Sequence, residues 1–115
     1  MDTLCKIRDM YRAIAEFEIR FEKAYQLGLN EGMLLCCLSR TEEISSGEIA
    51  EQLGLTYSNT SKVIKSMENK GFVKRAIGDN DKRQMYFSLT PKGKAKIKEI
   101  DSGAIEIPEL LKNIL

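Results

Sequence analysis

The hydrophobic positions between residues 45 and 71 recur at the three- and four-residue spacing of α-helices. Ser45 stands three residues before Glu48, the spacing of a capping box that starts a helix. Gly54 can end this helix in the left-handed conformation, and Thr56 can cap the next one. The predicted inward positions are Ile49, Ala50 and Leu53 in the first helix, and Thr60, Val63, Ile64 and Met67 in the second. Two helices joined by a short glycine-containing turn predict a helix-turn-helix.

A pattern typical of strands follows this pair of helices. Gly71 ends the second helix, and residues 72–77 read as one strand. Residues 84–89 alternate between polar and apolar side chains, which predicts a second strand. Residues 78–83 between them form a charged, turn-rich loop, and residues 43–45 can supply a short edge strand. A β-hairpin after a helix-turn-helix predicts a winged helix, a mainly α fold with a small β-hairpin.

The flanking segments predict further helices within a single domain of 115 residues. A helix over about residues 3–27 carries a broad apolar stripe, longer than so small a domain can cover alone. The tail 104–115 is also rich in apolar residues. We therefore expect residues 1–28 and 99–115 to be dimerisation helices and residues 29–98 to form the winged helix, although the first helix could instead pack only within its own chain.

The outward side of the second helix of the pair is short, polar and positive. Ser58, Lys62, Lys65 and Asn69 point away from the apolar side, with Asn59, Ser61 and Ser66 beside them. Serine and asparagine can reach base edges and phosphates, and lysine pairs with phosphate. An ordinary solvated helix face is the alternative interpretation, but such a face usually mixes glutamate with lysine, and here only Glu68 lies near the edge.

Charge is distributed unevenly along the chain. Residues 56–98 hold 11 lysines and arginines against 3 acids, a net charge of +8, whereas residues 1–55 carry −4 and residues 99–115 carry −3. The positive block coincides with the second helix and the hairpin, as nucleic-acid binding requires. In the hairpin loop, Lys82 and Arg83 suit the negative minor groove, and Asp81 could orient the Arg83 guanidinium.

The segments IAEQLGLTYSNTSKVIKSMENKGFVKR and DNDKRQMYFSLTPKG together resemble the MarR family of winged-helix regulators. The resemblance implies a homodimer that binds a pseudo-palindromic site in double-stranded DNA, usually as a repressor. It implies major-groove reading by the second helix and Arg83 in the minor groove. Family members often respond to small phenolic ligands or oxidants, so a small-molecule effector is a further expected partner. The expected DNA-binding residues are Ser46, Thr56, Ser58, Asn59, Ser61, Lys62, Lys65, Lys82 and Arg83, with Asp81 supporting the wing.

Other classes of function find little support. The chain has no histidine, no glycine-rich phosphate loop and no recognisable nucleophile set, which argues against an enzyme. The adjacent Cys36 and Cys37 lack the usual ligand spacing, so we expect no metal and no cofactor. No apolar run is long enough to span a membrane, and three cysteines without a targeting signal predict the cytoplasm. A winged helix that binds another protein, without DNA specificity, is the alternative function.

Cys5 is the thiol with the clearest potential for reactivity. It lies opposite the apolar stripe of the first helix, near the helix N-terminus and one turn from Arg8, and both features favour the thiolate. The resulting hypothesis is that Cys5 oxidation weakens DNA binding. The alternative is an incidental cysteine at a frayed helix end.

Overall fold

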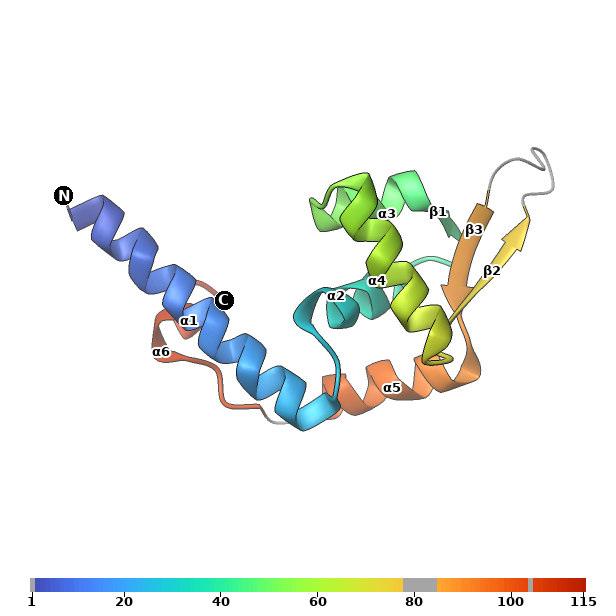
Figure 1. The fold of residues 1–115 in the computed structure, drawn as a ribbon. Coiled ribbons are helices and arrows are strands. Elements are labelled where there is room, and N and C mark those ends of the chain that lie inside the picture. The colour runs from blue at the N-terminus through green and yellow to red at the C-terminus, as the bar shows by residue number, and fades with distance from the viewer. Residues whose placement is uncertain (1, 78–84, 104) are drawn as a thin grey trace. The chain divides into compact units, whose positions relative to one another are not determined.

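A computed structural model describes residues 2–77, 85–103 and 105–115 of the chain (Figure 1). The fold divides into two compact units. One unit comprises Met1–Leu29 together with Gly103–Leu115, and the other comprises Asn30–Ser102. The second unit, here called the central unit, contains the predicted helix-turn-helix and strands.

The first unit pairs one long helix with the end of the chain. Helix α1 spans Asp2–Tyr25, and the short helix α6 spans Glu109–Lys112. The Arg20 guanidinium donates a hydrogen bond of 2.9 Å to the Glu106 carbonyl and thereby holds the tail against α1. Helix α1 ends two residues before the predicted end, because Gln26 adopts a positive φ of 57°. The predicted stripe is buried only in part: Phe21 and Tyr25 are buried, whereas Leu4, Ile7, Tyr11 and Ile14 are exposed.

The central unit contains four helices among its described residues. They are α2 (Leu29–Ser39), α3 (Ser46–Leu53), α4 (Tyr57–Asn69) and α5 (Pro91–Ser102). Ser45 and Glu48 form the predicted capping box of α3, and Gly54 ends that helix with a φ of 66°. The Thr56 hydroxyl accepts a hydrogen bond of 3.1 Å from the Asn59 amide at the start of α4. These local signals explain where α3 ends and α4 begins.

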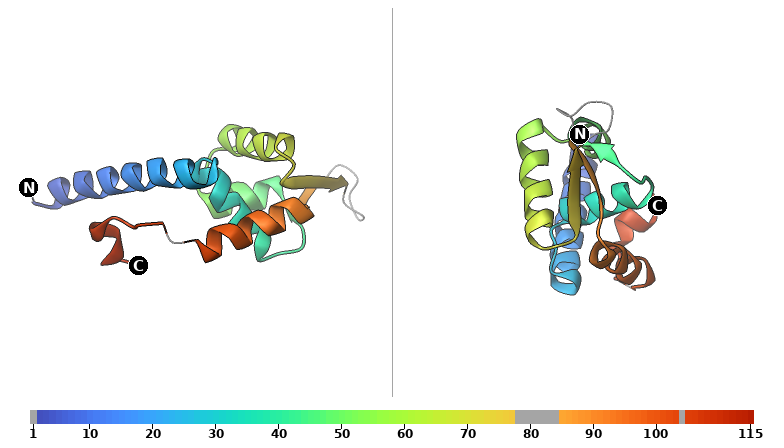
Figure 2. Two further views of the ribbon diagram at one scale, coloured as in Figure 1. Left: turned by 90° about the horizontal axis from the view of Figure 1, so that it is seen from below. Right: turned by 90° about the vertical axis from the view of Figure 1, so that its right-hand side faces the viewer.

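A three-stranded antiparallel sheet lies beside these helices. Its strands are β1 (Ile44–Ser45), β2 (Val73–Ile77) and β3 (Met85–Leu89), in the order β1-β3-β2. Ile44 and Arg75 both pair with Phe87 in the central strand. Both views of Figure 2 place α4 on one side of the β2–β3 hairpin and α5 on the other. The predicted mainly α winged helix with a small β-hairpin is therefore confirmed.

The core of the central unit is formed by apolar side chains from its helices and its sheet. It includes Leu34, Leu35 and Leu38 of α2, Ile49 of α3, Ile64 and Met67 of α4, and Phe87 and Leu89 of β3. Helix α5 approaches this core through Gly93, where a Cβ atom would lie 2.2 Å from the Phe72 carbonyl oxygen. The Thr90 hydroxyl accepts a hydrogen bond of 3.0 Å from the Gly93 amide, so Thr90 caps α5.

Candidate nucleic-acid interface

Helix α4 presents two chemically different sides, as its sequence predicts. Thr60, Ile64 and Met67 are buried, and the Thr60 hydroxyl donates to the Thr56 carbonyl at 2.8 Å. The opposite side is exposed and consists of Ser58, Asn59, Ser61, Lys62, Lys65 and Asn69. Within the described part of the chain, neither Lys62 nor Lys65 has an acidic partner. This side of α4 can therefore offer two unpaired cations and several short hydrogen-bonding groups to a polyanion.

The start of α3 borders the start of α4. Ser46 is the first residue of α3 and is half-buried, whereas Thr56 is exposed just before α4. Tyr57 was not among the predicted site residues, yet 66% of it is exposed. Its hydroxyl lies close to Gly47, since a Cβ atom there would be 3.2 Å from that oxygen. An exposed aromatic hydroxyl at the first position of the second helix is a signal that could have identified Tyr57 from the sequence.

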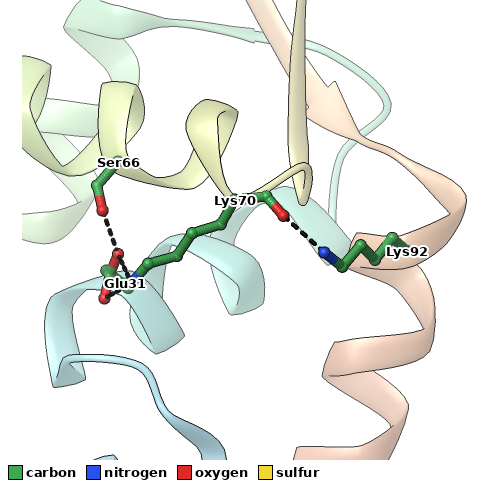
Figure 3. A network of polar contacts seen from close by, with 4 residues as sticks. All are labelled: Glu31, Ser66, Lys70 and Lys92. Carbon is green, nitrogen blue, oxygen red and sulfur yellow. Dashed lines mark hydrogen bonds and ion pairs between the residues drawn. The ribbon is translucent and has the colours of Figure 1, made fainter.

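An ion-pair network holds the last turn of α4 against the first turn of α2 (Figure 3). The Glu31 carboxylate accepts hydrogen bonds from the Ser66 hydroxyl at 2.7 Å and from the Lys70 ammonium at 2.9 and 3.0 Å. Only 13% of the Glu31 side chain is exposed. Because Ser66 is bonded to Glu31, its hydroxyl belongs to the support of α4 and is less available to a ligand than the exposed serines.

Lys92 stabilises the same end of α4 from helix α5. Its ammonium donates to the Lys70 carbonyl at 2.8 Å and lies 4.8 Å from the centre of the Phe72 ring. A cation at a helix C-terminus is favoured by the helix dipole. The network shows why a lysine stands at the start of α5, where a cation opposes that helix's own dipole.

The wing is described only along its two strands. The register pairs Val73 with Leu89 and Ile77 with Met85, so the two strands run together as far as Ile77. The predicted DNA-binding residues Lys82 and Arg83, and the supporting Asp81, lie outside the described residues. Their roles stay predictions from the sequence.

The cysteines differ sharply in environment. Cys5 is exposed, Cys36 is half-buried and Cys37 is buried. Burial raises the pKa of the Cys37 thiol, with a smaller contribution from Cys36, and the thiol donates to the Gln52 side-chain oxygen at 2.9 Å. The Arg8 guanidinium, which we expected to favour a Cys5 thiolate, pairs with Asp9 at 3.3 Å. Cys37 is thus kept in its neutral form, and only Cys5 is freely accessible.

The described residues contain neither a cluster of potential metal ligands nor a helix that could span a membrane. No group of three or more histidine, cysteine or acidic side chains there could hold a metal ion. No described helix combines the length and apolar character required to cross a membrane.

Comparisons with known proteins agree with the winged-helix fold. The model of the MarR family matches residues 27–85, just over half of the chain. The chain belongs to the MarR family, whose members are transcription regulators rather than enzymes. An uncharacterized HTH-type transcriptional regulator of Bacillus subtilis, YwaE, is 28% identical over 96 residues, which is 80% of this chain and 56% of YwaE. The chain spans about half the length of the curated relatives it matches.

Solved structures show the same fold. The transcriptional regulator BldR from Sulfolobus solfataricus is similar with a TM-score of 0.77 and 27% identity, covering 98% of this chain and 76% of BldR. The complex of MepR from S. aureus with DNA is similar with a TM-score of 0.69 and 16% identity, covering 94% of this chain and 83% of MepR. At that identity, the MepR complex supports the fold alone.

Proposed function

We propose that this chain is a transcriptional regulator that binds double-stranded DNA and reads the major groove with helix α4. The observation that carries the proposal is the exposed side of α4, on which Lys62 and Lys65 lack acidic partners among the described residues and short polar side chains surround them. The helix is supported near its C-terminal end by Glu31 and Arg75. The MepR complex demonstrates that a protein with this fold binds DNA.

Each group on this surface has a chemical role in the proposal. Lys62 and Lys65 pair with phosphates, which positions the helix without reading sequence. Ser58, Asn59 and Ser61, near the start of α4, approach the base edges, where hydroxyl and amide groups can distinguish base pairs. Ser46 and Thr56 border this surface at the starts of α3 and α4 and contact the sugar–phosphate backbone of the DNA. Tyr57 joins them as an additional DNA-binding residue. In the wing, Lys82 and Arg83 enter the minor groove with Asp81 as support.

We propose in addition that the protein acts as a homodimer on a pseudo-palindromic site. Leu4, Tyr11 and Ile19 of α1 are 66%, 72% and 67% exposed, and Ile114 and Leu115 at the chain end are 62% and 85% exposed. Exposed apolar side chains gathered on the terminal segments in this way favour burial against a second protein chain. A two-fold dimer would place its recognition helices in successive major grooves, about 34–36 Å apart.

Repression, and release by a small molecule or oxidant, are the regulatory part of the proposal. The resemblance to the family supports the proposal that the protein is a repressor. Cys5 is the candidate for oxidation because its thiol is exposed. Peroxide treatment should weaken DNA binding by the wild type but not by Cys5→Ser. An unchanged wild-type affinity would remove the oxidant from the proposal and leave the DNA binding intact.

Selection of duplexes from a random pool tests the proposed function without a known operator. We expect the wild type to enrich a two-fold symmetric sequence. The variant Lys62→Gln/Lys65→Gln should retain far less DNA, whereas Lys94→Gln/Lys98→Gln, with the same loss of charge at exposed positions of α5, should enrich the same sequence. Failure of the wild type to enrich any sequence would contradict the proposal and favour the protein-interaction module.

A further inference from the structure

A second positively charged surface lies in the central unit, away from the exposed side of α4. A cavity of about 640 Å³ opens between the α2–β1 connection, the β2 and β3 strands, and helix α5. Both views of Figure 2 place α5 and the α2–β1 connection across the β2–β3 hairpin from α4. The phosphates bound by the exposed side of α4 would therefore not fill this cavity.

Four cations border the cavity. They are Arg40 of the α2–β1 connection, Lys74 of β2, and Lys94 and Lys98 of α5. Among the described residues of the lining, Glu42 is the single acid, so these residues together carry a charge of +3. All four cationic side chains are exposed, and none forms an ion pair with another described residue.

This absence of ion pairs distinguishes the four cations from their neighbours. Lys70, Arg75 and Lys96, in the same unit, each pair with an acid. Like charges gathered around a concave surface repel one another and create a positive potential, which an anion relieves on binding. The cavity is thus electrostatically suited to an anionic ligand.

The remaining lining indicates what kind of anion fits. Leu38, Leu89 and Ile97 contribute apolar surface, and Ser88 contributes a hydroxyl group. A volume of about 640 Å³ is within the usual range of small-molecule sites and far larger than a bare inorganic ion needs. Apolar walls with a few converging polar groups are typical of sites for organic ligands.

We propose that this cavity binds a small organic anion whose phosphate or carboxylate group pairs with Lys94, Lys98, Lys74 and Arg40, and whose apolar part lies against Leu89 and Ile97. Binding of such a ligand requires no DNA, so the proposal stands separately from the proposed function. Because Lys74 and Ser88 belong to the two strands of the wing, a bound molecule would connect the base of the wing with α5.

Titration with phenyl phosphate, which carries both an anionic and an apolar part, tests the proposal. The protein is followed by amide NMR shifts and by calorimetry in the absence of DNA. We expect saturable shifts at Thr41 and Ser88, which line the cavity, and affinity that falls with added salt. Inorganic phosphate should bind more weakly because it lacks the apolar part, and phenol should bind more weakly because it lacks the charge.

Matched variants separate the cavity from general surface charge. Lys94→Gln/Lys98→Gln should weaken phenyl phosphate binding about tenfold or more, since two charge-assisted hydrogen bonds are removed. Lys6→Gln/Lys23→Gln removes the same charge from exposed positions of α1 and should leave the affinity unchanged. Glutamine preserves helix propensity at all four positions. Equal weakening by both variants, or shifts spread evenly over the surface, would overturn the proposal. Separate carboxylate and phosphate probes, benzoate and phenyl phosphate, then show which anion the site prefers.

Discussion

The guanidinium of Arg75, on strand β2, donates two hydrogen bonds to the carboxylate of Glu68, near the end of α4, with N–O distances of 2.7 and 2.5 Å. Arg75 also lies 5.6 Å from the centre of the Phe87 ring on the neighbouring strand. The pair raises the pKa of Arg75 still further, mainly through its hydrogen bond to Glu68. The pair joins α4 to strand β2 and neutralises Glu68 at the edge of the exposed side of α4.

Arg75→Gln should lower DNA affinity while changing stability little. The substitution leaves the Glu68 carboxylate without this partner near the proposed DNA surface, where it would repel phosphate. Half of the Arg75 side chain is exposed, so the pair contributes less than about 1 kcal/mol to the free energy of unfolding. DNA affinity and thermal unfolding of the same samples provide the two readouts.

The double variant Glu68→Gln/Arg75→Gln is the control for this prediction. With the unpaired acid also removed, much of the affinity should return. If the double variant binds as weakly as Arg75→Gln alone, repulsion by Glu68 is not the cause, and Arg75 itself would then bind DNA directly.

The Glu31 network should contribute measurably to stability. Glu31→Ala removes the acceptor of the Ser66 and Lys70 hydrogen bonds, and we expect a loss of about 1–3 kcal/mol in denaturant unfolding. Glu51→Ala, at an exposed acid of α3, should stay within about 0.5 kcal/mol of the wild type. Equal stability of the two variants would show that the network does not fix the end of α4.

Replacement of Gly93 by a larger residue should destabilise the fold. In Gly93→Ala, the added Cβ would lie 2.2 Å from the Phe72 carbonyl oxygen, so α5 would have to move away from the start of β2. We expect a loss of about 1–3 kcal/mol despite the better helix propensity of alanine. Lys94→Ala, at the next and exposed position, should change stability by less than about 0.5 kcal/mol. A Gly93→Ala variant as stable as Lys94→Ala would contradict the close approach.

Cys37 should make the protein less stable at alkaline pH. Burial raises the pKa of this thiol in the folded state above its ordinary value of 9.0. As the pH rises past about 9, the unfolded chain loses this proton first, so the free energy of unfolding falls until the folded thiol also ionises. Unfolding from about pH 7 to about pH 10.5 should show a shallower decline for Cys37→Ala than for the wild type. If the free energy of unfolding falls with pH in parallel for the two proteins, the Cys37 thiol does not contribute to the decline.

The parts of the fold that follow from short-range chemistry were predictable from the sequence. The Ser45 capping box and the Gly54 helix end each depend on residues within one turn, and both are confirmed. The partner of Arg75 was not predictable, because the choice among acids depends on how β2 packs against α4. Glu31 and Lys70 are 39 residues apart, and no periodicity connects them.

The candidate site likewise has one part that was predictable from the sequence and one part that was not. The exposed side of α4 follows from helical projection, which needs only a spacing of about 100° per residue. The four cations around the cavity come from the α2–β1 connection, β2 and α5, so only the folded chain brings them together. A count of charge along the sequence shows that residues 56–98 are positive, but it cannot divide that charge between two surfaces.

The most direct test of the proposed DNA binding is a salt titration of affinity for the DNA upstream of the protein's own gene, measured beside a scrambled duplex. We predict tight, sequence-selective binding, with an association constant whose logarithm falls steeply and linearly with the logarithm of salt concentration. Lys62→Gln/Lys65→Gln should reduce this slope by about one unit for each lysine–phosphate pair that the substitution removes. Weak and equal binding to both duplexes, or a slope unchanged in the variant, would contradict the assignment of α4 as the DNA-reading helix.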